Sequence, residues 1–214
     1  MDATPREGSR LSPGTRKTVN FIVYQSSWLA GVVAAAHGQA ALGCLAVVAA
    51  IGLHLWLAPQ RAPEIRLVLA ALGVGLAWES LLVSLGLFRY SSGNFAAGLA
   101  PYWILALWAQ FATTLNLSLA WLKGRPVLGA VFGLVGGPLA YFAGYRLGAL
   151  HSPDLPLALA LQGIGYGVFV PLLCALAVRW NGFVGVMGEG AARAEPARAT
   201  FAATLPVARE SGRA

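Results

Sequence analysis

The chain is poor in charged residues. Asp, Glu, Lys and Arg make up only 11% of its 214 residues, whereas a soluble domain carries roughly a quarter. Apolar residues make up 57%, and the mean hydropathy is +0.67. A soluble fold of this length would need more charge to cover its surface. The deficit therefore excludes an ordinary soluble domain and predicts that much of the surface meets lipid.

Cysteine is also scarce, and the patterns of metal and cofactor sites are missing. Cys44 and Cys174 each lie inside an apolar segment, and the sequence has no C-x-x-C, no Cys/His cluster and no H-E-x-x-H. The glycines within 163–167 are not a dinucleotide fingerprint, because no βαβ pattern surrounds them. We expect no metal and no cofactor.

The net charge of +7 raises the question of nucleic acid. The basic residues lie between and beyond the apolar segments and are not gathered into a stripe with aromatic residues. That distribution is typical of membrane topology, so we expect no nucleic-acid partner.

Six apolar segments follow one another: approximately 20–36, 39–58, 66–88, 101–122, 126–149 and 155–179. Each has about 17–25 residues, enough to cross a hydrocarbon core ~30 Å thick. The sequence therefore predicts an all-α fold, a polytopic bundle of six transmembrane helices over residues 20–180. The flanking residues 1–19 and 181–214 are predicted to be disordered tails.

The basic residues also predict the orientation. Thirteen of the fifteen Lys and Arg lie in the two tails, at the end of the last segment and in the loops around 61–66 and 123–125. Only Arg89 and Arg146 lie on the other side. By the positive-inside rule we expect a multi-pass membrane protein with both termini in the cytoplasm.

Small residues mark the expected helix-packing faces. In lipid, helices associate where small residues let their backbones approach closely. The fifth segment carries such a stripe: Gly129, Gly133, Gly137 and Gly144. In the third segment Gly75 shares a stripe with Glu79, and in the second segment His54 lies on the small-residue face. Glu79 and His54 are therefore predicted to point into the bundle.

Glu79 is the acidic residue that lies clearly within a predicted span. An ionisable group at that depth is costly and marks a functional site by default, although a Glu that locks helices together explains it equally well. Arg146 and Tyr141 are the candidate catalytic helpers. Arg146 has a simpler interpretation, in which its side chain reaches to the membrane interface.

Four polar residues are predicted to line a pocket or bind substrate: Gln110, Thr114, Gln162 and Tyr166. The alternatives are hydrogen bonding between helices for the amides and membership of an interfacial aromatic belt for the tyrosine. The bilayer is the expected surrounding, and a membrane-protein partner or a homo-oligomer is left open.

A set of residues carries a family resemblance: Asn20, Tyr24-Gln25, Trp28, Glu79-Ser80, Pro101-Tyr102-Trp103, Leu107-Trp108, Phe111, Thr114-Leu115, Gly136-Gly137-Pro138, Tyr141 and Gly144. In these the chain resembles a bacterial family of uncharacterised membrane proteins, domain of unknown function 2878, over about residues 19–178. The family has no assigned activity. Its association with fatty-acid-modifying enzymes implies a link with lipid metabolism.

Three functions compete at this point. The first is an accessory protein of envelope or lipid metabolism, which needs only the packing features. The second is a membrane-embedded lipid-modifying enzyme with Glu79 as acid or base. The third is a small-solute transporter that uses Glu79, although no repeat relates the two halves of the chain.

Overall fold

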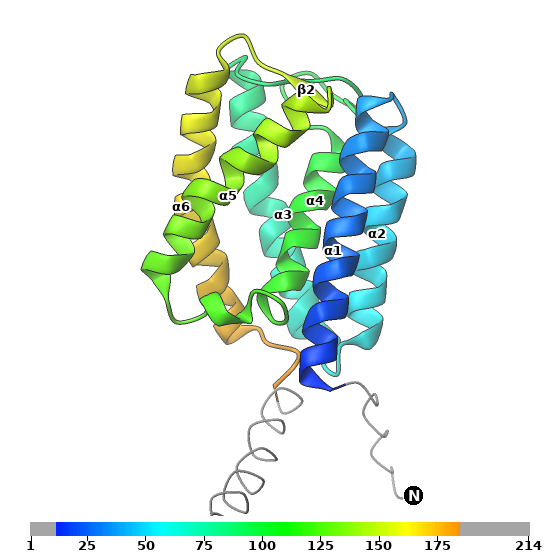
Figure 1. Ribbon diagram of the computed structural model, residues 1–214, viewed down its shortest axis with the longest axis vertical. Coiled ribbons are helices and arrows are strands. Elements are labelled where there is room, and N and C mark those ends of the chain that lie inside the picture. Colours follow the sequence, from blue (N-terminus) through cyan, green and yellow to red (C-terminus); the bar gives the residue numbers. More distant parts are fainter. Residues whose placement is uncertain (1–11, 185–214) are drawn as a thin grey trace, which may run out of the picture.

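The computed structural model describes residues 12–184, and this part of the chain folds into six α-helices (Figure 1). The elements are α1 Pro13–Ala36, α2 Ala40–Leu57, α3 Arg61–Ser84, β1 Arg89–Tyr90, α4 Tyr102–Leu115, a 3₁₀ turn η1 Ala120–Leu122, α5 Pro126–Arg146, β2 Leu150–His151 and α6 Leu155–Arg179. The all-α prediction is confirmed. The disordered tails predicted for 1–11 and 185–214 lie outside the described residues.

Five of these helices are long and apolar enough to cross a membrane, and α4 is not among them. The predicted fourth span, 101–122, contains a helix of only 14 residues, which is about 21 Å long at ~1.5 Å per residue. Ten of those 14 residues are buried. Helix α4 is therefore the interior helix of a multi-pass membrane bundle, and the chain leaves it at Asn116.

Two helices begin earlier than the sequence predicted. Helix α1 starts at Pro13, where the Ser12 hydroxyl accepts a hydrogen bond from the Thr15 amide at 3.2 Å, so residues 13–19 are helical and not part of a tail. Helix α3 starts at Arg61. The sequence analysis placed Pro63 in a loop, but it lies in the first turn of α3. Proline is tolerated there because backbone N–H groups in the first turn have no acceptor within the helix.

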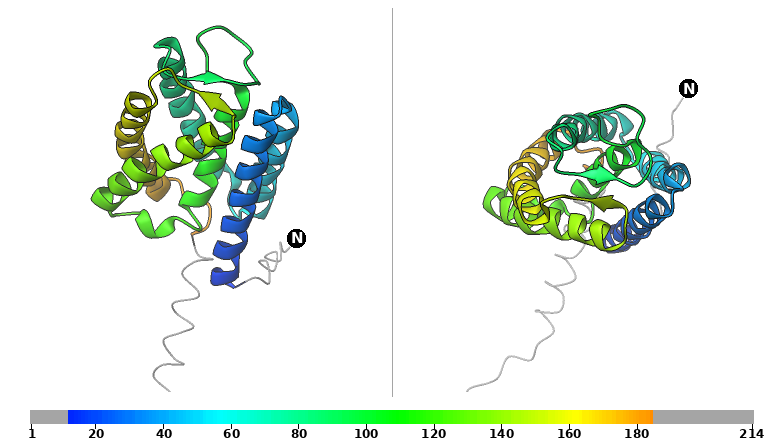
Figure 2. Two further views of the ribbon diagram at one scale, coloured as in Figure 1. Left: turned by 45° about the horizontal axis from the view of Figure 1, so that its top comes forward. Right: turned by 90° about the horizontal axis from the view of Figure 1, so that it is seen from above.

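Helices that follow one another in the sequence pack in pairs, and α4 lies among them. Helix α1 packs on α2, and α5 packs on α6, which it crosses obliquely (Figures 1 and 2). Helix α4 contacts α1, α2, α3 and α6. The interior of the bundle is thus built against the side chains of α4.

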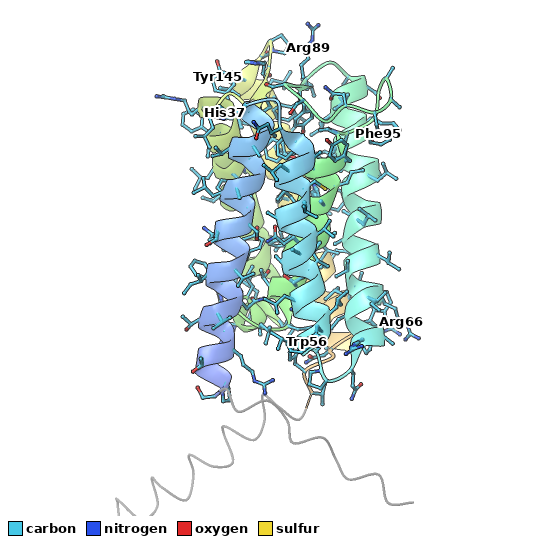
Figure 3. All side chains as sticks on the ribbon, turned by 90° about the vertical axis from the view of Figure 1, so that its right-hand side faces the viewer. His37, Trp56, Arg66, Arg89, Phe95 and Tyr145 are labelled. Atoms are coloured by element: carbon cyan, nitrogen blue, oxygen red, sulfur yellow. The ribbon has the colours of Figure 1, made fainter. Side chains whose placement is uncertain are left out.

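The bundle has two distinct ends. At one, which we call the sheet end, β1 pairs antiparallel with β2 and joins Arg89 to His151. The Ser91 hydroxyl there donates to the Gly148 carbonyl at 2.6 Å. At the other, the terminal end, the described chain begins and ends (Figure 1). Arg89 and His37 lie at the sheet end, and Arg66 lies at the terminal end (Figure 3).

Glycines of α5 and α3 lie where side chains would collide. A Cβ at Gly133 would overlap the backbone carbonyl of Tyr166, and one at Gly137 would overlap the Tyr166 ring. Gly129 faces Pro171, Gly144 faces Leu150 and a Cβ at Gly75 would overlap Trp108. Gly75, Gly133 and Gly137 therefore lie at close helix approaches, whereas Gly129 makes an ordinary contact with α6 and Gly144 faces Leu150 of β2.

Candidate functional site

The largest described hollow is a cavity of about 430 Å³ between α1, α4, α5 and α6, which we call the lateral cavity. Its walls are rich in aromatic side chains: Phe21, Tyr24, Trp28, Trp103, Trp108, Phe111, Phe132, Tyr141 and Tyr166. The α5 wall adds small residues, including Gly136 and Ala140. Because no charged residue is among the described lining residues, the cavity suits an apolar or amphiphilic guest.

Part of the lining of the lateral cavity is exposed on the surface of the bundle. Helices α1 and α5 both line it, but α1 packs chiefly on α2 and α4, and α5 packs chiefly on α6. Two lining side chains lie at its mouth, since Phe21 is 52% exposed and Leu139 is 61% exposed. Gln25 also lines the cavity and is exposed. The exposed part of the lining is therefore uncharged.

Glu79 lies behind the wall formed by Trp108 and is completely buried. Its Oε1 accepts hydrogen bonds from Trp108 Nε1 at 2.9 Å and from Gln162 Nε2 at 3.0 Å. Its Oε2 faces the Tyr90 hydroxyl at 3.5 Å. Burial and the neighbouring carboxylate raise the pKa of the Tyr90 phenol well above its ordinary value, so this hydroxyl keeps its proton and donates.

The orientation of the Gln162 amide follows from a second indole. Trp78 Nε1 donates to Gln162 Oε1 at 2.7 Å, and an indole N–H can only donate. The NH₂ group of Gln162 must therefore face Glu79. Glu79 Oε1 accepts from two obligate donors, so Oε2 is the oxygen that can carry or release a proton.

Two tyrosines of the cavity wall lie near this carboxyl group. Tyr141 is buried, lines the cavity and lies close enough to Glu79 to interact with it electrostatically. Tyr166 also lines the cavity, and its ring packs against Trp108 at a centroid distance of 4.7 Å with the two rings tilted by 45°. Phenol hydroxyls of the cavity wall therefore lie near Glu79.

The residues predicted to form one pocket fall into three places. Thr114 and Tyr166 line the lateral cavity, together with Tyr141. Gln162 lies behind the wall, in the Glu79 network. Gln110 borders a different, smaller pocket.

Arg146, the predicted helper of Glu79, lies away from it. Its side chain is exposed, and its guanidinium carbon lies 6.0 Å from the centre of the Phe142 ring. Among residues 12–184 no contact joins Arg146 to Glu79, and no group of three His, Cys, Asp or Glu residues could hold a metal ion. Of the two predicted helpers, Tyr141 is the one whose side chain lies near Glu79.

A second buried carboxylate was missed by the sequence analysis. Glu64 is 1% exposed and lies in the first turn of α3, at the terminal end. Its Oε2 is 2.8 Å from His54 Nε2, and its Oε1 accepts from Asn116 Nδ2 and from the Gly182 amide, each at 2.7 Å. Glu64 therefore fastens the segment after α6 to the interior of the bundle. The signal that could have revealed Glu64 as a helical residue was Pro63, the third residue of α3, because proline is common in the first turn of a helix.

The same cluster includes a cation. Lys123 Nζ donates to Asn116 Oδ1 at 2.7 Å, and Asn116 Nδ2 also donates to the Trp180 carbonyl at 2.9 Å. Partial burial lowers the pKa of Lys123, and the nearby Glu64 opposes that shift. The amide of Asn116 is thereby fully engaged at the point where α4 ends.

These features define a class: a multi-pass helical membrane protein with an aromatic-lined cavity and two buried carboxylate clusters. The chain belongs to the family described as protein of unknown function, DUF2878, whose model matches residues 17–172. The resemblance found in the sequence is thereby confirmed. Curated proteins and solved structures gave no match.

Proposed function

We propose that this protein binds a lipid-like amphiphile in the lateral cavity and serves envelope or fatty-acid metabolism as an accessory protein of the bacterial inner membrane. The observation that carries the proposal is the cavity itself, about 430 Å³ of aromatic-lined space open between α1 and α5. An acyl chain can fill such a space without losing contact with apolar surroundings.

The few polar groups of the lining support an amphiphile over a hydrocarbon. Gln25, Thr114 and Ser118 line the cavity, and none of the three carries a charge. Thr114 and Ser118 lie close to the end of α4 at the terminal end. A polar head placed there meets hydroxyl and amide groups, while the tail extends toward the aromatic rings.

The transport alternative receives less support. Glu64 and Glu79 lie at opposite ends of the buried stripe of α3, but Leu67 and Ala71 between them are both 0% exposed. Trp108 covers Gly75 on the same stripe. A continuous polar path from one carboxylate to the other therefore has no support among the described residues.

The enzyme alternative is favoured by one specific observation, the position of Tyr141 between Glu79 and the lateral cavity. Glu79 would act as the acid or base, and Tyr141 would carry the proton to a bound lipid. In this case Tyr141→Phe is expected to abolish turnover of the bound lipid while lipid binding persists. The lipids extracted from the purified protein and from its Tyr141→Phe variant are compared, which measures the amount of lipid bound and the amount converted. Identical levels of converted lipid would exclude the enzyme alternative.

The cavity proposal is tested by filling the space. Gly136 lines the cavity, and a Cβ there would meet only Phe132, at 3.9 Å. We expect Gly136→Leu to reduce photocrosslinking of a diazirine-bearing palmitic acid by about tenfold, since an affinity loss of about 1.4 kcal/mol suffices for that. The label is read by mass spectrometry of the full-length protein in nanodiscs.

The matched control is the same substitution on the lipid-facing surface. Gly73 is exposed, and a Cβ there would meet nothing within 4 Å. Gly73→Leu should label like the wild type. Equal labelling of the wild type and the two variants would show that the probe reads the bilayer and not the cavity. A deletion strain with an unchanged lipid profile would count against the link with lipid metabolism.

The orientation is proposed with both ends of the described chain facing the cytoplasm. The described chain begins and ends at the terminal end (Figure 1), as the positive-inside count requires. Green fluorescent protein fused after residue 214 should fluoresce, and alkaline phosphatase at the same position should be inactive. Active phosphatase would overturn this orientation.

A further inference from the structure

A second, separate hollow lies at the terminal end between α1, α2 and α4. This terminal pocket has a volume of about 50 Å³. Its lining includes residues from three helices and from the segment after α6: Arg16, Asn20, Tyr24, His54, Gln110 and Phe183. Phe183 is 1% exposed and its ring stacks on His54 at 5.4 Å, so it closes the pocket from below the helices.

One polar atom of a residue that lines the terminal pocket has no partner among residues 12–184. Gln110 is 1% exposed, and its Nε2 donates to Ser27 Oγ and to the Tyr24 carbonyl. Its Oε1 is buried without a hydrogen-bond partner among residues 12–184. Leaving such an oxygen unsatisfied costs about 1–3 kcal/mol, so the site calls for a donor that the described chain does not provide.

We infer that the terminal pocket is a binding site for ordered water. A buried water molecule needs about 10–15 Å³ of cavity volume and two to four polar partners. The terminal pocket, with about 50 Å³, therefore has room for more than one water molecule. Gln110 Oε1 supplies an acceptor. His54 lines the same pocket, and its Nδ1 is the ring nitrogen that Glu64 does not engage. Water in the pocket can donate to the first and hydrogen-bond with the second.

The charges around the terminal pocket favour neutral water over an ion. An anion would face the negative end of the Gln110 carbonyl dipole, with the Glu64 carboxylate directly behind His54. Water can donate to Gln110 and can also accept a hydrogen bond, which no simple ion can do.

This water has a consequence beyond the proposed function. Tyr24 lines both the terminal pocket and the lateral cavity. Water held against Tyr24 therefore reaches the wall of the lateral cavity from the terminal end.

Hydroxyl-radical footprinting by X-ray pulses tests the inference on the full chain in nanodiscs, because radicals formed from bound water oxidise the side chains beside it. Phe183 and Phe88 are each 1% exposed, but Phe88 packs among Tyr90 and Tyr141 and borders no described pocket. Phe183 should be oxidised several times faster than Phe88. Equal slow rates would show that the terminal pocket is dry and would overturn the inference.

Filling the pocket separates bound water from local opening of the chain. Ala50 lines the terminal pocket, whereas Ala49 is exposed on the outer surface of α2. Ala50→Leu should slow the oxidation of Phe183 to the rate of Phe88, and Ala49→Leu should leave it unchanged. Ala50→Val serves where the larger side chain prevents folding. Fast oxidation that persists in both Ala50 variants would assign it to chain opening and overturn the inference.

Discussion

Replacement of Glu79 by alanine is expected to lower the free energy of unfolding by about 2–5 kcal/mol. Trp108, Gln162 and Tyr90 all lose their acceptor, and hydrogen bonds within membrane bundles are worth about 0.6 kcal/mol on average and up to about 1.7. Each group also stays buried, which leaves it unsatisfied. The measurement is unfolding of the purified protein in mild detergent, followed by tryptophan fluorescence.

Glu79→Gln is the matched variant, and we expect it to unfold within about 1.5 kcal/mol of the wild type. The amide oxygen can still accept from Trp108 and Gln162. The amide NH₂ replaces Oε2 and can donate to the phenol oxygen of Tyr90, which reverses one hydrogen bond and removes none. A Gln variant as unstable as the Ala variant would show that the negative charge, and not hydrogen bonding, holds this cluster together.

The same pair of variants distinguishes the possible roles of Glu79. A side chain that serves only to join α3, α4 and α6 can be replaced by an isosteric amide. An acid or base cannot, because an amide neither takes up nor releases a proton at Oε2. A stable Glu79→Gln protein that binds lipid but leaves it unchanged, where the wild type modifies it, would establish the catalytic role. Unaltered function in that variant would exclude it.

The inward direction of Glu79 could be predicted, but its partners could not. The four-residue spacing between Gly75 and Glu79 placed the carboxylate on a packing face, and Trp108 does cover Gly75. The donors come from α4, α6 and β1, which are brought together only by the three-dimensional packing. No spacing in one sequence encodes such a meeting.

The errors at the ends of helices have local causes. Hydropathy extended the fourth span to residue 122, but the chain turns at Asn116 because its amide finds Glu64, Lys123 and Trp180 as partners. A continuing helix would not offer those contacts. Asn20 draws the next residues inward in the same way, since its Oδ1 accepts from the Ser118 hydroxyl at 2.7 Å. Tertiary hydrogen bonds, which hydropathy does not represent, decide where α4 ends.

Glu64→Ala is expected to destabilise the protein by a similar amount, about 2–5 kcal/mol, but at the opposite end of the bundle. Asn116, the Gly182 amide and His54 all lose their partner. The Gly182 amide has no other acceptor within the described hydrogen bonds, so its hydrogen exchange should accelerate strongly. Hydrogen–deuterium exchange of the peptide that contains residues 180–184 measures this, with the full chain in nanodiscs.

Two variants show whether this effect is local. Glu64→Gln keeps an oxygen for Asn116 and Gly182 and alters only the contact with His54, so the exchange of residues 180–184 should stay slow. Glu79→Ala removes a cluster nearer the sheet end and should leave that peptide protected as well, because stability is lost in separate units. Rapid exchange in all three variants would mean that the bundle opens as a whole. Rapid exchange in Glu64→Ala alone would establish Glu64 as the anchor that holds the end of the chain, and with it Phe183, against the terminal pocket.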